Sequence, residues 1–179
     1  AFSARCVPLF SLRFDGPAGL EEAKKFSEEV LAVFLPTLFI FTLVFEAAMP
    51  AFVWAIASGY ADEPAKFDLT VFLTRITFPY LLLISLVSLF SGVLNSLTKF
   101  AAAAFAPALL NIAMLAALLL VPPGGIPPAI ALSVGVTVGG VLQLALLWNS
   151  ARKAGVSLRL RKPKNTPSVK QFFVVVIPA

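Results

Sequence analysis

The sequence contains no histidine and only one cysteine, Cys6, among its 179 residues. A single cysteine excludes a disulfide within the chain, and a metal site made of cysteine and histidine ligands is excluded for the same reason. The glycine-rich patterns that bind nucleotide phosphates, GxxxxGK[ST] and GxGxxG, are also absent. We therefore predict no metal, no cofactor and no use of ATP. The sequence shows no candidate nucleophile paired with a general base, so we do not expect an enzyme.

Charged side chains are scarce as well. They make up 13% of the chain, against about 25% in soluble domains. Hydrophobic residues reach 59%, and the mean hydropathy is +0.94. A soluble fold of this size would have too little polar surface to cover itself. Because the apolar residues lie in long blocks, the composition predicts an all-α fold, a polytopic transmembrane helical bundle.

Four apolar blocks are long enough for a complete span, which needs about 20 residues in a helix. Turns rich in polar residues, glycine or proline separate them. The sequence begins and ends with an apolar block that is too short for a complete span. We therefore expect this chain to be an internal portion of a longer protein, with each end inside a helix. The predicted complete spans are 30–50, 76–97, 101–121 and 129–149, with partial spans at about 1–13 and 171–179 and a basic loop at 150–170.

Aromatic and charged residues after Pro50 indicate where the chain leaves the membrane. Trp54 and Tyr60 follow this proline, and amphipathic aromatic residues collect at the bilayer boundary. Residues 66–75 then combine charged and apolar positions with helical spacing. We predict an interfacial stretch after Pro50 and a short amphipathic helix over 66–75.

Glycine and proline mark the helices themselves. Gly135, Gly139 and Gly140 occur in the last complete span, where small residues allow another helix to approach closely. Glycine that faces lipid is the alternative. Four prolines are hinge candidates, although kinks without motion are equally consistent. These hinge candidates are Pro36, Pro50, Pro79 and Pro107.

The formal net charge of +5 is concentrated beside the apolar blocks, which indicates a membrane surface rather than nucleic acid. Because successive spans alternate in direction, the loops around 13–29, 95–100 and 150–170 share one side. That side holds twelve of the fourteen Lys and Arg residues. The positive-inside rule places these loops in the cytoplasm. The last basic loop could also bind anionic lipid head groups. The favoured interpretation is that its charge only sets the orientation of the chain in the membrane.

Several short strings of the sequence occur in a familiar order and spacing. Two are specific, RITFPY at 75–80 and FAPxxxNI at 105–112. Others are GYAD at 59–62, GVLNS at 92–96 and TVGGVLQL at 137–144. Together they resemble the MurJ (formerly MviN) family of lipid II flippases, and the resemblance runs from the first residue to the last.

This resemblance implies a bacterial fourteen-helix transporter of the multidrug/oligosaccharidyl-lipid/polysaccharide exporter superfamily, with two lobes that work by alternating access. The chain would run from the end of helix two to the beginning of helix seven, most of the N-terminal lobe. The implied function is flipping of the peptidoglycan precursor lipid II to the periplasmic leaflet of the inner membrane. The implied partners are lipid II, membrane lipids and the rest of the same transporter chain.

Other functions stay open beside this one. A related drug/cation antiporter, a polysaccharide-lipid exporter and a non-transporting membrane scaffold are the alternatives. The chain also departs from the family in two places. Arg5-Cys6 stands where small or aromatic residues are expected, and a proline common before the FAP string is replaced within 101–104. Since the family's important arginines lie mainly outside this chain, it is not expected to transport alone.

Three residues are candidates for a substrate cavity, because the diphosphate of lipid II requires a polar, water-filled route. Asn111 follows Pro107 by one turn and offers a donor and an acceptor, with a helix–helix hydrogen bond as the alternative. Arg5 lies within a predicted partial span and is a possible cationic partner for the diphosphate. Glu46 is an acid in an apolar run, a candidate proton or cation site for which simple snorkelling to the outer interface is favoured.

Overall fold

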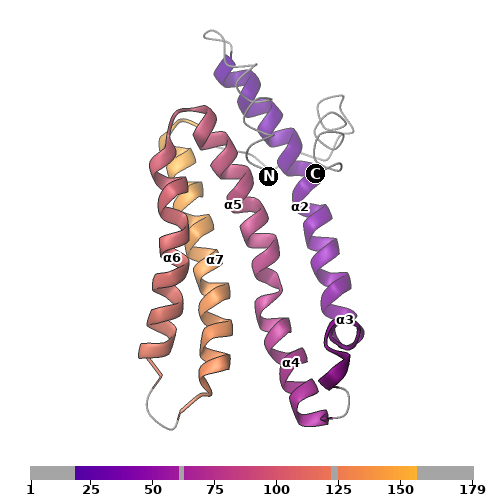
Figure 1. The fold of residues 1–179 in the computed structure, drawn as a ribbon. Coiled ribbons are helices and arrows are strands. Elements are labelled where there is room, and N and C mark those ends of the chain that lie inside the picture. The colour runs from indigo at the N-terminus through magenta and orange to yellow at the C-terminus, as the bar shows by residue number, and fades with distance from the viewer. Residues whose placement is uncertain (1–18, 61–62, 122–124, 157–179) are drawn as a thin grey trace. The chain divides into compact units, whose positions relative to one another are not determined.

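The computed structural model describes residues 19–60, 63–121 and 125–156, and within these ranges every regular element is a helix (Figure 1). The predicted all-α class is confirmed. The two partial spans and Arg5 lie outside the described residues. The elements are α2 (Gly19–Ala47), α3 (Met49–Ile56), a 3₁₀ turn η1 (Ser58–Tyr60), α4 (Pro64–Thr77), α5 (Pro79–Ser96), α6 (Phe100–Leu119) and α7 (Pro128–Lys153).

Four helical segments are long and apolar enough to cross a membrane, as the sequence predicted. One of them combines α4 and α5 into 33 residues, Pro64–Ser96. At 1.5 Å per residue this segment is about 50 Å long, more than the roughly 30 Å hydrocarbon core. The remaining three segments are Ser27–Ala47, Phe100–Leu119 and Pro128–Lys153.

The described residues form two compact units, each made of parts of several helices. The first unit contains 19–37, 85–106 and 144–156. The second contains 38–60, 63–84, 107–121 and 125–143. Each unit is described by itself below.

An aromatic cluster holds α2, α3 and α4 together in the second unit. Phe78 is buried, and its ring lies 5.4 Å from that of Phe45 and 6.2 Å from that of Phe52, measured between centroids. Met49 and Val71 are buried in the same cluster. Aromatic pairs at this spacing each contribute about 0.5–1.5 kcal/mol beyond the area they bury. The cluster therefore fixes the short helix α3 against the ends of its neighbours.

Pro50 starts α3 rather than kinking a longer helix. It occupies one of the first two positions of α3, where its missing N–H is not needed for a helical hydrogen bond. Trp54 and Tyr60, predicted for the membrane boundary, are both exposed beyond it. The predicted amphipathic helix over 66–75 is part of α4, with Phe67 packed against the aromatic cluster.

Pro79 separates α4 from α5, and a bond from α7 lies beside the break. The proline has no N–H to donate to the Arg75 carbonyl four residues before it. The carbonyl of the next residue, Ile76, accepts a hydrogen bond from the hydroxyl of Thr137 in α7. This polar bond ties α7 to the end of α4.

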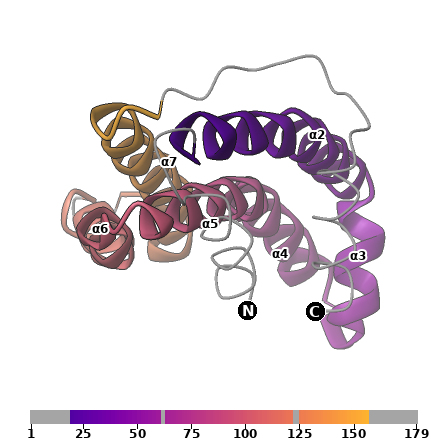
Figure 2. The same cartoon turned by 90° about the horizontal axis from the view of Figure 1, so that it is seen from above.

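Glycines bring α7 into close contact with its neighbours within the second unit (Figure 2). A Cβ atom added to Gly139 would lie 2.8 Å from Leu110 Cδ1 and 3.2 Å from Leu110 Cα in α6. One added to Gly140 would lie 2.7 Å from Tyr80 Cδ2 in α5. Gly135 is equally close to α6, at 2.9 Å from Ala117 Cβ. The predicted close packing is confirmed, and lipid-facing glycine is excluded at these positions.

In the first unit, apolar side chains from α2, α5 and α7 are buried. Phe90 of α5 contacts Trp148 of α7 edge to face, with ring centroids 5.4 Å apart. Leu94 and Leu147 are fully buried. These contacts hold the end of α5 against the end of α7.

Substitution of Gly139 by alanine tests the helix contact. We expect Gly139→Ala to lower the free energy of unfolding by about 1–3 kcal/mol, because the new methyl overlaps atoms of Leu110. The matched control is Gly59→Ala, since nothing lies within 4 Å of a Cβ built at Gly59. The measurement is thermal unfolding in detergent. Equal stability of the two variants would contradict the close contact.

Candidate functional site

Asn111 lies on a face of α6 that no described helix covers. Its side chain is exposed, as is that of Pro107 one turn earlier, and its amide makes no hydrogen bond to any residue in the described ranges. The predicted alternative, a helix–helix hydrogen bond, is therefore not made by this part of the chain. Pro107 also leaves the carbonyl of Ala103 without its helical donor. Asn111 and this carbonyl together give α6 a polar surface.

Asn111 is a single polar side chain on the exposed surface of α6. With 3.6 residues per turn, successive residues are about 100° apart. The exposed Phe105 and Ile112 then share one stripe, and the buried Ala106 and Ala113 share another. Asn111 falls about 100° from the first stripe, on the side away from the second, and the exposed Leu115 and Leu118 follow it one and two turns later. Helix α6 thus has a face packed on α7 and a broad exposed surface that is apolar apart from the amide.

An amide in contact with acyl chains would lose its hydrogen bonds to water and gain none in return. That loss costs several kcal/mol per group in hydrocarbon. The Asn111 amide therefore needs water or a polar protein group beside it. A substrate cavity would supply such surroundings.

Glu46 is half-buried near the end of α2, and its Oε1 atom is shielded from solvent. No residue in the described ranges donates a hydrogen bond to that oxygen. Simple snorkelling would instead leave both carboxylate oxygens in water. The charge of Arg75, in the last turn of α4, acts on the carboxylate without forming a direct ion pair. The structure therefore adds Arg75 to the surroundings of Glu46.

The candidate residues do not form one cluster. Asn111 and Glu46 both belong to the second unit, but no hydrogen bond or ion pair between them occurs within the described part of the chain. Arg5 lies outside the described ranges, and its role stays a prediction.

The hinge candidates occupy two kinds of position. Pro36 and Pro107 lie inside α2 and α6, and the boundary between the two compact units passes beside each of them. By contrast, Pro50 and Pro79 stand at the beginnings of α3 and α5. A hinge at any of the four remains a prediction.

Sequence reasoning missed the position of Arg75 near Glu46, because it treated Arg75 only as the end of the amphipathic helix over 66–75. The signal was present, because Glu46 and Arg75 are opposite charges at the ends of neighbouring predicted spans, on the same predicted side. Thr137 was also missed. A single threonine in an apolar span carries no sign of its partner 61 residues away.

Comparison with known proteins identifies one family over the whole sequence. The family model described as lipid II flippase MurJ matches residues 1–179. A probable lipid II flippase MurJ of Rhizobium tropici is 48% identical over 183 residues, which cover 100% of this chain and 34% of the relative. The lipid II flippase MurJ of Burkholderia cenocepacia is 36% identical over 183 residues, covering 100% of this chain and 35% of that protein.

The chain belongs to the MurJ family. It spans about a third of the length of the curated relatives it matches. Membership confirms the resemblance carried by the RITFPY and FAPxxxNI strings. It also supports the view that the described helices are part of a multi-pass membrane protein.

A double-mutant cycle tests whether Glu46 and Arg75 interact. We expect the effects of Glu46→Gln and Arg75→Gln on the free energy of unfolding to couple by about 0.5 kcal/mol, because Glu46 is half-buried while Arg75 is exposed to solvent. The control is the exposed pair Glu63–Lys66, 2.6 Å apart, for which coupling below about 0.5 kcal/mol is expected. Denaturant unfolding of the six variants gives both values. Strictly additive effects at 46 and 75 would show that the two charges are independent.

Proposed function

We propose that this chain forms part of one lobe of a transporter that flips lipid II from the cytoplasmic to the periplasmic leaflet for cell-wall synthesis. The observation that carries the proposal is the match of all 179 residues to the lipid II flippase family. The helices described above supply the rigid frame that a rocking lobe requires. Because flipping breaks no covalent bond, the chain needs no nucleophile and acts without catalysis.

The exposed amide of Asn111 supports a place for this residue beside the substrate route. The diphosphate and sugars of lipid II cannot enter hydrocarbon, whereas its isoprenyl tail can stay there throughout. A lobe therefore needs polar groups along the route of the head group. In α6, Asn111 and the carbonyl that Pro107 frees offer hydrogen bonds without a fixed charge. Cationic partners for the diphosphate would come from Arg5 and from other parts of the transporter.

The inner membrane is the proposed location, with the basic loops in the cytoplasm. Three basic residues in the described ranges support this orientation: Lys99 between α5 and α6, and Arg152 and Lys153 in the last turn of α7. All three belong to the first unit. In the second unit, Glu63 and Asp68 stand beside Lys66 and Arg75, so positive charge does not dominate there.

Cysteine labelling tests the orientation. In a full-length transporter in which Cys6 and every other native cysteine are replaced, we expect a membrane-impermeant maleimide to label Gly59→Cys in intact spheroplasts. We expect Thr98→Cys to react only after permeabilisation, because its loop lies on the cytoplasmic side. Both positions are exposed, so accessibility alone does not separate them. The reverse labelling pattern would overturn the orientation.

Complementation tests the function. The full-length gene containing this segment should sustain growth when it replaces a host's essential lipid II flippase. Asn111→Ala should lower the flipping rate by about tenfold, the equivalent of one polar contact of about 1.4 kcal/mol. The matched control is Ile112→Ala, an exposed neighbour on the apolar face of α6, which should flip at nearly the wild-type rate. A normally inserted protein that fails to complement would overturn the flippase proposal.

A further inference from the structure

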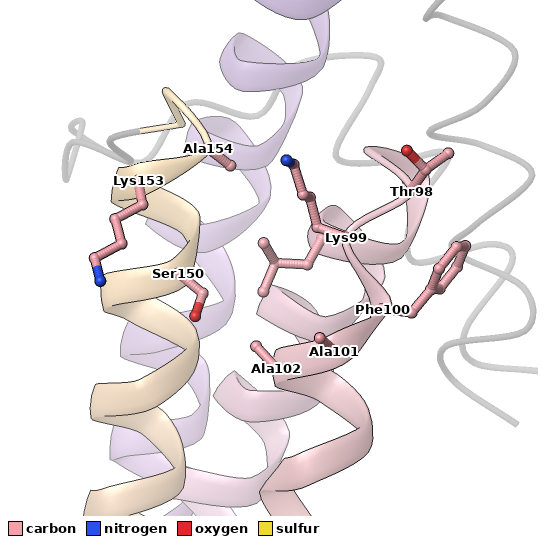
Figure 3. A pocket seen from close by; sticks show the side chains of 9 residues that line it. Thr98, Lys99, Phe100, Ala101, Ala102, Ser150, Lys153 and Ala154 are labelled. Carbon is pink, nitrogen blue, oxygen red and sulfur yellow. The ribbon is translucent and has the colours of Figure 1, made fainter.

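A cavity of about 500 Å³ opens in the first unit, where α5, α6 and α7 end or begin (Figure 3). It lies at the end of two candidate spans, since Phe100 is the first residue of one and Lys153 is the last residue of the other. By length and composition the cavity therefore lies at a membrane boundary. It is lined by Leu94, Thr98, Lys99, Phe100, Ala101, Ala102, Ser150, Lys153 and Ala154.

The turn between α5 and α6 shapes one wall of the cavity. Lys99 donates its backbone N–H to the Leu94 carbonyl at 2.9 Å, and Thr98 donates to the Asn95 carbonyl at 3.1 Å. This pair of bonds is the Schellman arrangement that ends many helices, with the residue before the last donor in the left-handed conformation. Thr98 has that conformation, with φ at +58°, although glycine is usual there. The chain reverses abruptly, and α6 begins at the next residue after Lys99.

Helix α6 begins with backbone donors that no carbonyl of the helix can use. The backbone N–H groups of Phe100, Ala101 and Ala102 belong to the first turn of α6, so no helical carbonyl precedes them. Lys99, the residue before the helix, has an ammonium group that cannot accept a hydrogen bond. No acceptor for these three N–H groups occurs in the described ranges. All three residues line the cavity.

Positive charge and a hydroxyl complete the lining. Lys99 extends into the gap between the start of α6 and the end of α7, and the Ser150 side chain projects from α7 into the same gap (Figure 3). Lys153 also lines the cavity, and in Figure 3 its flexible side chain runs along the other side of α7. None of the nine lining residues is acidic. The polar part of the site therefore consists largely of donors and positive charge.

A phosphate fits this chemistry. It accepts several hydrogen bonds at once, carries negative charge, and is favoured at a helix N-terminus flanked by lysines. The rest of the lining is apolar, from Leu94, Ala101 and Ala102, and the exposed Phe100 lies beside it. An apolar wall next to a phosphate site at a membrane boundary suits a lipid better than a free anion.

We propose that this cavity binds the phosphate of an anionic phospholipid in the leaflet at the basic side of the protein. Lys99 and Lys153 neutralise the charge, the first N–H groups of α6 and the Ser150 hydroxyl donate to the phosphate oxygens, and the glycerol and upper acyl chain lie along the apolar wall. The site lies in the first unit, and none of the candidate substrate residues lines it. It would anchor the ends of α6 and α7 at the membrane surface whichever substrate the transporter moves.

Lipid binding to the full-length protein in detergent tests the proposal, with native mass spectrometry as the readout. We expect phosphatidylglycerol to bind more tightly than phosphatidylcholine. Lys99→Gln and Lys153→Gln should each weaken phosphatidylglycerol binding about fivefold. The matched control is Arg152→Gln, which removes a charge from the same turn of α7 but does not line the cavity, and it should change binding less than twofold.

A variant that keeps every charge distinguishes binding in the cavity from non-specific attraction of anionic lipid to the basic surface. Ala102→Phe fills the space beside the α6 amides and should weaken phosphatidylglycerol binding at least as much as the loss of one lysine. If Arg152→Gln is as damaging as Lys153→Gln and Ala102→Phe binds normally, the proposal is overturned. Thermal unfolding of each variant verifies that the helices remain folded.

Inorganic phosphate distinguishes the source of the ligand. Millimolar phosphate should compete weakly with phosphatidylglycerol, because it lacks the contacts with the apolar wall. Complete displacement by phosphate, together with no preference for phosphatidylglycerol over phosphatidylcholine, would overturn the lipid assignment. Binding is measured without transport, so the outcome does not depend on whether the protein flips lipid II.

Discussion

Helices packed in lipid gain little hydrophobic free energy from touching each other, because the acyl chains they displace are as apolar as their own side chains. Their association depends on close contact between backbones and on a few polar bonds. In this chain the close contact is made by Gly139 and Gly140 of α7, which leave room for Leu110 of α6 and Tyr80 of α5. A side chain at Gly139 would also press on the backbone of Leu110, since a Cβ there lies 3.2 Å from Leu110 Cα. The arrangement of the other faces, including the one that carries Asn111, depends on this contact.

The second requirement of the membrane is that every polar group be satisfied within the protein or by water. Helix α4 shows how an apolar segment can contain polar residues under this rule. The hydroxyls of Thr70, Thr74 and Thr77 each donate to a carbonyl about one turn earlier in α4. These threonines therefore add no unsatisfied group to the segment. Thr137 acts differently, since its hydroxyl reaches the Ile76 carbonyl of another helix beside the Pro79 break.

Sequence reasoning predicted those features that depend on local composition. The apolar blocks gave the helices, and the glycines of α7 indicated the close contact because small side chains in lipid have few other uses. It did not predict that Lys99 and Lys153 line one cavity, since 54 residues separate them and only the packing of α5 against α7 brings their helix ends together. The left-handed Thr98 was also unpredictable, because threonine rarely adopts that conformation. Asn111 was identified from its type and place, but its exposed face required the helix contacts.

The uneven burial of the helices links the fold to the proposed function. In the apolar window of α6, 11% of the residues are buried, against 39% in that of α7. A helix that packs on one neighbour and otherwise faced only lipid would be apolar around the rest of its surface. Helix α6 is apolar over its exposed surface except at Asn111, whose stripe also holds the exposed Leu115 and Leu118. The amide needs water or a polar partner, which lipid alone would not supply. For a chain that spans about a third of the length of its relatives, the remaining helices and the substrate route are where that partner would lie.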